Sequence, residues 1–300
     1  MIQHLTDRVS VVFTEDGFTS GNCILVEDDV RLMIDSGCGR ELDSVRPEAV
    51  ELLLCSHHHV DHIGGNDRFV NARILAHPLE AAAMQVAEKL IATDRWQELM
   101  DEENFFCVPE VNGAPNRLYL PWRVDGPLAE GQVVDCGATR IGVIHTPGHT
   151  AGHCSFHLLD DDIVFIADIC LSKVGPWYGG RDSGIDAFIA SIDRIIDMKP
   201  ATIVTGHLGS VLTENIPGVL GEYRGRILNR ESRILAYVRD HPSTINELAQ
   251  RHFIYPAHPS LFVLYWEKSM LHNHLDRLIA LGEVARYDDG RYGPARVLGA

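Results

Sequence analysis

The chain has no long uninterrupted apolar run. No stretch of its 300 residues approaches the roughly 18 consecutive apolar residues of a membrane-spanning helix. The first residues, MIQHLTDRVSVVF, lack the basic segment followed by an apolar segment that marks a secretory signal. We therefore expect a cytoplasmic protein that is neither secreted nor inserted in a membrane.

Cysteine is sparse, and its spacing excludes a disulfide framework. The seven cysteines are odd in number, include no C-x-x-C pair and lie mostly in apolar runs. This pattern favours reduced thiols in the core of a cytoplasmic protein. Cys170 follows Asp168 by two residues, so it is either a buried neighbour of a site or a thiol that faces it.

Positive charge is also scarce. The chain carries 26 Lys+Arg and 42 Asp+Glu, a formal net charge of −16. Residues 1–214 hold 15 basic and 33 acidic residues, whereas residues 215–300 hold 11 basic and 9 acidic residues. An acidic surface repels polyanions, so we expect a small-molecule substrate rather than a nucleic acid, although the acidity also simply promotes solubility. The change in composition predicts two domains, residues 1–214 and residues 215–300.

Histidine and aspartate, in contrast, are plentiful at positions with metal-ligand spacing. Apolar ELLLCS (residues 51–56) predicts a buried strand that leads directly into HHHVDH. Alternate residues of an extended segment point the same way, and the next pair can aim at a second point as a helix begins. Imidazole and carboxylate suit zinc and similar metals. Four segments together offer seven such side chains, enough for two neighbouring metal ions: His57, His59, Asp61, His62, His149, Asp168 and His207.

With these residues the chain resembles the metallo-β-lactamase-fold hydrolases. The H-x-H-x-D-H motif that begins at His57 matches the family signature, and a TPGHT turn, an Asp at a strand end and a Gly-His pair follow in the family's order. The similarity covers roughly residues 8–214. The resemblance implies a four-layer αββα sandwich of two sheets with outer helices. The periodicity of the chain by itself indicates only a mixed α/β fold.

The resemblance also implies a role for each ligand. Carried over by position, three side chains bind the first metal (His57, His59 and His149), three bind the second (Asp61, His62 and His207), and Asp168 bridges them. A metal-activated water then attacks a carbonyl carbon, so that no protein nucleophile is required. Asp61 is also a catalytic candidate for proton relay. The expected cofactors are two divalent ions, zinc first, with iron and manganese as alternatives that the same ligands suit.

Four other histidines receive no ligand role. The family's pattern gives none to His58, His145 and His153, and residues beside a metal loop often orient its ligands through hydrogen bonds. His77 precedes Pro78 where a strand passes into a helix, so a role in that turn is expected.

Two segments are candidates for substrate contact. The Gly-rich run CLSKVGPWYGGRDSG contributes Lys173, Trp177 and Tyr178. Within residues 77–126 the family's pattern is loosest. Aromatic residues there either cover an apolar substrate or belong to the core: Trp96, Phe105, Phe106, Tyr119 and Trp122.

Residues 215–300 predict three helices followed by a hairpin. The second helix carries the capping-box pair Thr244 and Glu247, and the hairpin turns at Asp-Gly in EVARYDDGRYGPARV. This order resembles the winged-helix module that follows the catalytic domain in a glyoxalase II-like branch of the family. Its candidate recognition helix, LYWEKSMLHNHLDRLIAL, has few cations. Packing against the catalytic domain, or against a partner subunit in a homodimer, is therefore favoured over DNA binding.

The sequence thus predicts a dinuclear-metal hydrolase of a thioester, ester or lactone, with acyl-CoA-like thioesters among the candidates. The glutathione specificity of glyoxalase II is not expected, because LSKVGPWYGG lacks the basic and aromatic run of that enzyme. Two alternatives stay open. One is a nucleic-acid-processing or nucleic-acid-binding enzyme that uses the winged helix. The other is a mono-iron redox enzyme of the same fold, against which the retention of all seven ligand positions argues.

Overall fold

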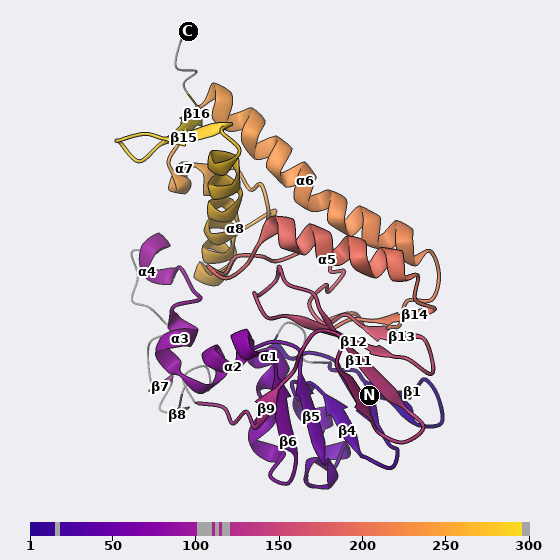
Figure 1. Cartoon of the computed structure of the whole chain (residues 1–300). Coiled ribbons are helices and arrows are strands. Elements are labelled where there is room, and N and C mark those ends of the chain that lie inside the picture. Colours follow the sequence, from indigo (N-terminus) through magenta and orange to yellow (C-terminus); the bar gives the residue numbers. More distant parts are fainter. Residues whose placement is uncertain (16–18, 101–109, 112–113, 116–120, 296–300) are drawn as a thin grey trace.

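Two facing β-sheets form the centre of the molecule (Figure 1). The structure is a computed structural model, and it describes residues 1–15, 19–100, 110–111, 114–115 and 121–295. Buried side chains from both sheets, such as Val11, Ile34, Phe156 and Phe165, belong to one hydrophobic cluster. This shared cluster holds the two sheets face to face.

The first sheet has the strand order β1-β2-β3-β4-β5-β6-β9. Its strands β1 to β4 pair antiparallel, and its strands β4, β5, β6 and β9 pair parallel. Apart from β1 and β9, these strands lie in short apolar runs of the sequence, and β5 is the strand predicted before the histidine motif. Their bounds are β1 Ile2–His4, β2 Val9–Val12, β3 Cys23–Val26, β4 Leu32–Ile34, β5 Leu52–Cys55, β6 Arg73–Ala76 and β9 Gly126–Pro127.

The second sheet has the strand order β10-β11-β12-β13-β14. Strands β10 to β13 pair antiparallel, and β14 adds to β13 in parallel. The bounds are β10 Val133–Asp135, β11 Arg140–His145, β12 Cys154–Leu158, β13 Ile163–Phe165 and β14 Thr202–Val204. A separate two-stranded ribbon is formed by β7 (Glu110–Val111) and β8 (Ala114–Pro115).

Helices cover the outer face of each sheet, which completes the four layers. Over the second sheet lies α5 (Ile185–Met198), whose buried face includes Phe188, Ile192 and Ile195 at helical spacing. Over the first sheet lie three short helices whose buried side chains share a third cluster with its strands: η2 (Gly39–Ser44), α1 (Val60–Ile63) and α2 (Pro78–Gln85). Two further short helices occur in this part of the chain, η3 (Pro47–Ala49) and η4 (Asn66–Arg68).

The apolar periodicity of LEAAAMQVAEKLIA (residues 79–92) predicts one helix, but the structure interrupts it. It forms α2 and α3 (Ala87–Ile91), with Val86 between them at φ −132° and ψ 110°. The carbonyl of Met84, free to accept at the end of α2, takes a hydrogen bond from the Trp122 backbone N–H at 2.8 Å. A contact with a distant segment therefore ends the helix. One further turn, α4 (Trp96–Leu99), follows.

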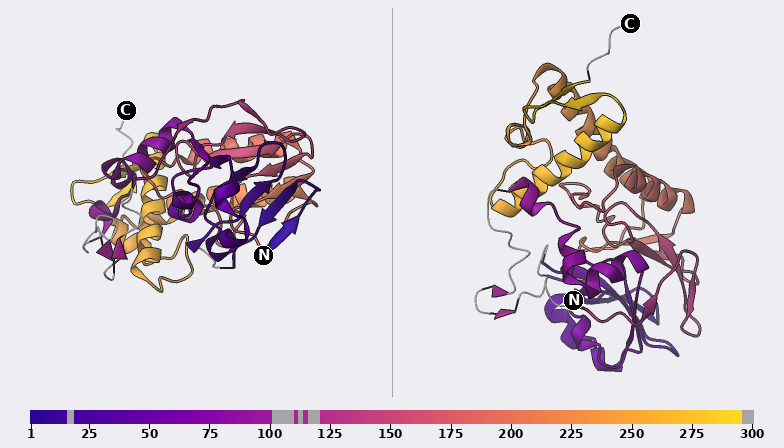
Figure 2. Two further views of the ribbon diagram at one scale, coloured as in Figure 1. Left: turned by 90° about the horizontal axis from the view of Figure 1, so that it is seen from below. Right: turned by 60° about the vertical axis from the view of Figure 1, so that its left-hand side comes forward.

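The C-terminal part consists of three helices and a hairpin. These are α6 (Ile216–Asp240), α7 (Ile245–Ala249), α8 (Leu261–Ala280) and the strand pair β15 (Val284–Arg286) and β16 (Tyr292–Pro294). The predicted capping box is present, since the Glu247 N–H donates to Thr244 Oγ1 and Glu247 Oε2 accepts from the Thr244 N–H. Figure 2 shows the hairpin at the far end of this part from the sheets.

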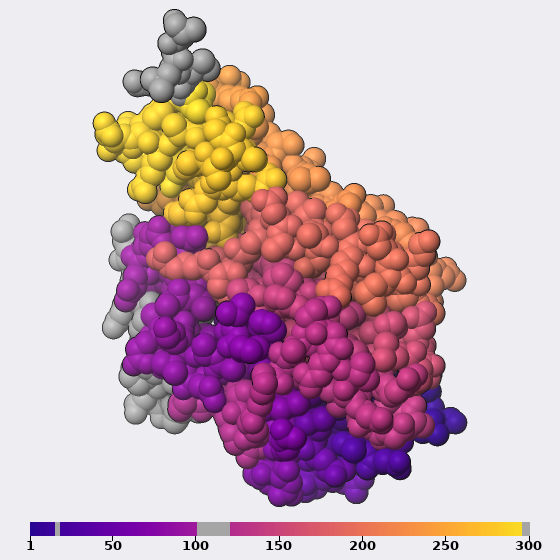
Figure 3. All heavy atoms as spheres, in the orientation of Figure 1, coloured from indigo at the N-terminus to yellow at the C-terminus, as the bar shows by residue number. Residues whose placement is uncertain are grey.

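The C-terminal helices pack directly on the rest of the chain, which is one of the two alternatives that the sequence left open. One hydrophobic cluster combines Val164 and Phe188 of the sandwich with Ile227 of α6 and Leu271 of α8. One turn earlier in α8, the Lys268 ammonium donates to the Leu99 carbonyl at 2.8 Å. Figure 3 shows the yellow atoms of the C-terminal part in contact with the purple and salmon atoms of earlier segments. No helix in the described ranges is both long and apolar enough to cross a bilayer.

Candidate metal centre

Four chain segments meet at one edge of the sandwich and bring their histidines and aspartates together. Strand β5 ends at Cys55 and leads into the motif, in which His59 is extended (φ −67°, ψ 141°) before α1 begins. The parallel pair β13 and β14 aligns Phe165 with Val204. Asp168 and His207 each follow these aligned residues by three positions, so their places are fixed by the strand pairing.

The first group of donor atoms comes from His57, His59, His149 and Asp168, and its atoms lie within 4.8 Å of one another. His59 Nδ1 is 3.1 Å from His57 Nε2 and 2.9 Å from His149 Nε2. Asp168 Oδ2 is 3.3 Å from His149 Nε2. Such separations suit ligands that each lie about 2.0–2.2 Å from one shared ion.

The second group comes from Asp61, His62, Asp168 and His207. Asp168 Oδ1 lies 2.9 Å from His62 Nε2 and 3.2 Å from His207 Nε2, and His207 Nε2 lies 3.3 Å from Asp61 Oδ2. Asp168 thus offers one oxygen to each group. Its carboxylate occupies the shared position, and both groups are able to bind a metal ion.

Two imidazoles form hydrogen bonds through Nδ1, and these bonds fix which ring nitrogen points toward the site. His149 Nδ1 lies 3.0 Å from the Trp177 carbonyl, and His62 Nδ1 lies 2.7 Å from Asp35 Oδ2. Because both partners only accept, each Nδ1 carries a hydrogen and each Nε2 turns a lone pair toward the site. His62 Nε2 and Asp168 Oδ1 lie 2.9 Å apart, and both are buried without a well-formed hydrogen bond among the described residues. Burial favours neutral His62, but the carboxylates around it raise its pKa, so this position favours a positive charge, which a proton or a metal ion can supply. The residues therefore fit a metal ion.

Burial keeps the histidines of the first group neutral. It lowers the pKa of His57 and His59 well below the ordinary range, and the charges that neighbouring imidazoles would carry add to the effect. Neutral imidazole is the form that binds metal ions. The first group is therefore prepared for a cation near neutral pH.

The second group is richer in negative charge. Burial opposes the ionisation of Asp168, but the imidazoles of His207 and His62 lower its pKa well below the usual range. Burial likewise favours neutral His207, but Asp168 and Asp61 raise its pKa to about 10. These carboxylates therefore attract positive charge to the position where the second group converges.

Comparison with known proteins agrees with this geometry. Residues 16–207 match the model of the metallo-beta-lactamase superfamily. The chain belongs to this superfamily. The family predicted from the motif is thus confirmed, together with its fold.

Relatives of this superfamily protein include an acyl-coenzyme A thioesterase and a hydroxyacylglutathione hydrolase. The chain is 27% identical over 242 residues to the acyl-coenzyme A thioesterase MBLAC2 of Gallus gallus, an alignment that covers 70% of this chain and 80% of that protein. It is 39% identical over 67 residues to a hydroxyacylglutathione hydrolase of Rhizobium johnstonii, which covers 22% of this chain and 25% of that enzyme. The longer alignment therefore involves the acyl-CoA thioesterase.

Solved structures share the fold over nearly the whole length of the chain. A metallo-beta-lactamase family protein from Thermus thermophilus has a TM-score of 0.75 at 22% identity, with 97% of this chain and 100% of that chain covered. A beta-lactamase domain protein from Burkholderia ambifaria has a TM-score of 0.69 at 17% identity, covering 98% and 93%. Both include the C-terminal helices in the shared architecture.

Asp35 supports the superfamily motif and was not predicted as a site residue. Its carboxylate accepts from His62 Nδ1, from the Ser56 N–H at 2.7 Å and from the Ser56 hydroxyl at 2.8 Å. Its backbone has φ 60°, an uncommon value for a residue with a side chain. Nearby Gly37 lies so close to the Asp61 carbonyl that a Cβ would come within 1.6 Å of the oxygen. The position of DSG directly after an apolar strand was the available signal.

Glu80 is a second supporting carboxylate that the sequence did not reveal. It accepts from the His58 N–H at 2.8 Å, from His58 Nδ1 at 2.5 Å, from the Thr150 hydroxyl at 2.7 Å and from the Gly152 N–H at 2.7 Å. It therefore ties the motif to the TPGHT turn. His58, Glu80 and Asp182 also form a third cluster of metal-type side chains. Both Glu80 oxygens already accept these hydrogen bonds. We therefore assign this cluster to holding the two segments together rather than to metal binding.

The other histidines position their neighbours, as predicted. His153 Nε2 accepts from the Asp168 N–H at 3.1 Å, and burial together with nearby His149 lowers its pKa to about 3. His145 Nε2 bonds the Ala151 carbonyl at 2.8 Å. His77 accepts from the Leu79 N–H and caps α2. None of these three belongs to the donor groups identified within the described residues.

The predicted substrate contacts lie in three different environments. The Trp177 ring is 5.4 Å from the His59 ring and 5.3 Å from the His149 ring, and Lys173 is exposed. Tyr178 is fully buried, with its hydroxyl 2.8 Å from His274 Nε2. This burial assigns Tyr178 to packing against α8 rather than to contact with a substrate.

The aromatic residues within residues 77–126 are of two kinds, those that the structure describes and those outside the described residues. Trp96 and Trp122 are buried, so they belong to the core, the alternative that the sequence left open. Phe105, Phe106 and Tyr119 lie outside the described residues. Cys170 is buried, with its Sγ 3.2 Å from the Tyr223 hydroxyl, and it belongs to none of the identified donor groups.

Proposed function

We propose that the protein is a dinuclear-metal hydrolase that cleaves the thioester bond of a small molecule. The observation that carries this proposal is the place of Asp168, which turns one carboxylate oxygen toward each of two converging donor groups. Three ligands would hold one ion (His57, His59 and His149), and three would hold the other (Asp61, His62 and His207). Zinc suits these ligands best as a redox-inert Lewis acid, with iron and manganese as alternatives.

When bound, two divalent ions supply Lewis acidity and lower the pKa of water toward about 7. Hydrogen bonds within the chain orient the side chains that would hold these ions. Asp35 fixes the His62 ring, and the Trp177 carbonyl fixes the His149 ring. Burial opposes the ionisation of Asp61, but His62 and His207 lower its pKa. Its side chain is 19% exposed, so this carboxylate is placed to accept a proton from a reacting group and pass it to solvent.

An acyl-coenzyme A thioester is the substrate class that the comparisons favour. The similarity to an acyl-coenzyme A thioesterase extends over 80% of that protein, whereas the similarity to the hydroxyacylglutathione hydrolase covers only 25% of that enzyme. Trp177 lies beside two histidines of the first group, where its ring offers apolar surface to an acyl chain. Esters and lactones remain secondary candidates for the same centre.

The C-terminal part, which we propose to be a winged-helix-like module, supports the centre rather than nucleic-acid binding. The two cations of α8 are engaged internally. Lys268 donates to the Leu99 carbonyl, and Arg277 pairs with Glu231 and Asp186. A helix whose cations are occupied offers little to phosphates in a groove. The six described cysteines are free and buried, which supports a reducing, cytoplasmic location.

The test is elemental analysis of the purified full chain combined with a substrate screen. We expect about two divalent ions per chain and hydrolysis of acetyl-CoA, measured by release of the free thiol, in preference to S-lactoylglutathione or a lactone. A metal-loaded chain that hydrolyses only lactones, or only RNA, would contradict the proposal. Iron with oxygen-dependent turnover would instead support the redox alternative.

A further inference from the structure

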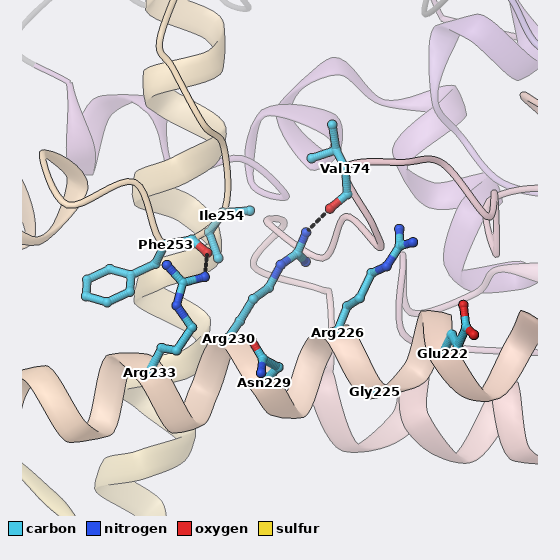
Figure 4. A pocket seen from close by; sticks show the side chains of 9 residues that line it. All are labelled: Val174, Glu222, Gly225, Arg226, Asn229, Arg230, Arg233, Phe253 and Ile254. Carbon is cyan, nitrogen blue, oxygen red and sulfur yellow. Dashed lines mark hydrogen bonds between the residues drawn. The ribbon is translucent and has the colours of Figure 1, made fainter.

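A cleft of about 400 Å³ lies between α6 and the segment that follows Asp168 (Figure 4). Arg226, Arg230 and Arg233 line it from α6, and their spacing of four and three residues places them on one face of the helix. Val174 lines the cleft from the segment after Asp168. The volume lies within the range of small-ligand sites.

The positive charge of these arginines is not neutralised by the described residues. Elsewhere on the same helix Arg224 pairs with Asp193, and in α8 Arg277 pairs with Glu231. In contrast, no carboxylate of the described ranges forms an ion pair with any arginine of the cleft. Glu222 also lines the cleft, yet no ion pair joins it to them. Three unpaired cations on one wall are unusual in a chain of net charge −16.

The arginines bond neutral backbone carbonyls instead. Arg226 Nη1 donates to the Ser172 and Lys173 carbonyls at 2.7 and 3.0 Å. Arg230, which is buried, donates from Nη2 to the Val174 carbonyl at 2.7 Å. These bonds orient the guanidinium groups without cancelling their charge. A guanidinium has five N–H donors, so Arg226 keeps donors for a ligand in its Nη2 and Nε groups.

Arg233 completes the cationic wall. Its Nη1 donates to the Phe253 carbonyl at 3.2 Å, and its guanidinium lies 5.6 Å from the centre of the Phe253 ring. Figure 4 shows the arginine side chains rising from one face of α6 toward the segments of Val174 and Phe253. The cleft therefore combines several guanidinium groups with an aromatic ring.

The cleft and the metal centre share one segment of chain. Val174 lines the cleft, and Trp177, three residues later, lies 5.4 Å from the His59 ring. Three residues of extended chain span at most about 11 Å. The cleft and the metal centre are therefore neighbours along this segment, and a ligand that occupies both carries its negative charge at one end and its reacting group at the other.

We propose that this arginine cleft binds the phosphate groups of a coenzyme A thioester. The inference rests on the proposed thioesterase function and adds to it the place where the nucleotide end is held. Guanidinium groups bind phosphate oxygens in a bidentate manner. The pantetheine arm of coenzyme A separates those phosphates from the thioester. The acidic surface of residues 1–214 repels a polyanion, so a local group of arginines is needed to hold one.

The first test measures binding without turnover. Coenzyme A and pantetheine carry the same thiol, so their difference in affinity for the metal-loaded full chain isolates the nucleotide end, and the arginine variants then test its phosphates. We expect the double variant Arg226→Gln/Arg233→Gln to bind coenzyme A at least about tenfold more weakly in calorimetry. Arg224→Gln, which removes a paired charge from the same helix, is the matched control and should bind as the wild type does.

The single variant Arg233→Glu controls for a folding defect, because Arg233 is exposed and its one hydrogen bond to a described residue goes to the Phe253 carbonyl. We expect this reversal of charge to weaken coenzyme A binding by about tenfold or more. Wild-type affinity for coenzyme A in both Arg233→Glu and the double variant would overturn the proposal. Equal affinity of the wild type for coenzyme A and pantetheine would overturn it too.

The second test compares turnover of acetyl-CoA with that of acetyl-pantetheine. The ratio of the two kcat/KM values should fall about tenfold or more in the double variant and stay constant in Arg224→Gln. If neither thioester is hydrolysed, the proposed function fails, while the binding test still decides whether the cleft holds phosphates. Tight binding of inorganic phosphate or adenosine diphosphate, with no gain from the pantetheine arm, would contradict the assignment to a substrate.

Discussion

At the scale of single residues, Asp168 is the side chain on which both donor groups depend. Its Oδ1 faces His62 and His207, and its Oδ2 faces His149. The backbone N–H of Asp168 is held by His153, so the carboxylate is positioned from behind as well. Removal of this carboxylate would take a donor from both groups at once.

We therefore expect Asp168→Ala to lose metal and activity together. Metal content should fall well below two ions per chain, and thioester hydrolysis should fall by more than about 100-fold. Plasma emission spectroscopy and a thiol-release assay measure the two quantities. Asp160→Ala, which removes an exposed aspartate that pairs with Arg140, serves as the control. Wild-type turnover in Asp168→Ala would refute the shared position.

Glu80 gives a prediction for stability against pH. Burial opposes the ionisation of Glu80, but His58 and the hydroxyl of Thr150 lower its pKa to about 2, against 4.5 ordinarily. A carboxyl whose pKa is lowered on folding stabilises the protein above the unfolded pKa. This stabilisation is lost as pH falls from about 4.5 toward 2 and amounts to about 3 kcal/mol at most.

Glu80→Gln should therefore lower the free energy of unfolding at pH 7 by up to this amount and by progressively less at acidic pH. Urea unfolding at several pH values measures the difference. Glu88→Gln, an exposed residue of α3, should leave both the stability and its pH dependence close to those of the wild type. A constant difference between wild type and Glu80→Gln across the range would exclude this linkage.

The site residues that could be predicted from the sequence lie in short local motifs. Those that could not be predicted act through hydrogen bonds to residues far away in the chain. The positions of the seven metal-type side chains follow from short motifs at strand ends, and the structure brings all of them together. Asp35 and Glu80 act through hydrogen bonds to residues 21 or more positions away in the chain. A local pattern contains no trace of such partners, so these two carboxylates look like ordinary polar residues.

At the scale of elements, the segment of residues 171–178 is held in place by α6. Arg230 donates to the Val174 carbonyl at 2.7 Å, to the Pro176 carbonyl at 2.7 Å and to the Tyr178 hydroxyl at 3.1 Å. Its side chain is buried, so these bonds are shielded from water. The segment that carries Trp177 thus owes its shape to a helix of the C-terminal part.

Arg230→Ala should consequently destabilise the protein by about 2–4 kcal/mol, because it leaves buried carbonyls without donors and creates a cavity. Arg224→Ala removes an exposed ion pair from the same helix and should cost less than about 1 kcal/mol. Chemical denaturation of the two variants gives the comparison. Equal stabilities would show that the bonds of Arg230 do not hold the segment.

The elements themselves were largely predictable. The strands, α5 and the capping box of α7 follow from local periodicity and local hydrogen bonding. The division between α2 and α3 does not, because the bond from Trp122 to Met84 that ends α2 comes from a segment remote in sequence. The local helix propensity of this segment predicts a continuous helix, but the hydrogen bond from Trp122 overrides that propensity.

At the scale of the whole molecule, the compositional boundary near residue 214 does not separate two hydrophobic cores. Val164 of the sandwich and Leu271 of α8 belong to the same buried cluster. Charge composition shows that the balance of acidic and basic residues changes near residue 214. It does not show which apolar faces of the helices and sheets pack against each other. That information lies in contacts between segments distant along the chain.

Deletion of residues 215–300 should therefore expose the apolar face of α5 and impair folding. We expect the truncated chain to bind a hydrophobic dye, to unfold without a cooperative transition and to lose metal. Calorimetry and dye fluorescence of the truncated and full chains measure this. Cooperative unfolding with two bound metal ions in the truncated chain would show that residues 1–214 form an independent unit.

The parallel pairing of β13 with β14 has a consequence for how such proteins diversify. Asp168 and His207 leave adjacent strands in matched register, so their separation is set by the ladder and not by the length of chain that joins them. Insertions or deletions in that connection, which includes the segment of Trp177, can reshape what the enzyme recognises without moving either ligand. Natural variation in the length of this connection can therefore change substrate specificity while the positions of Asp168 and His207 stay the same.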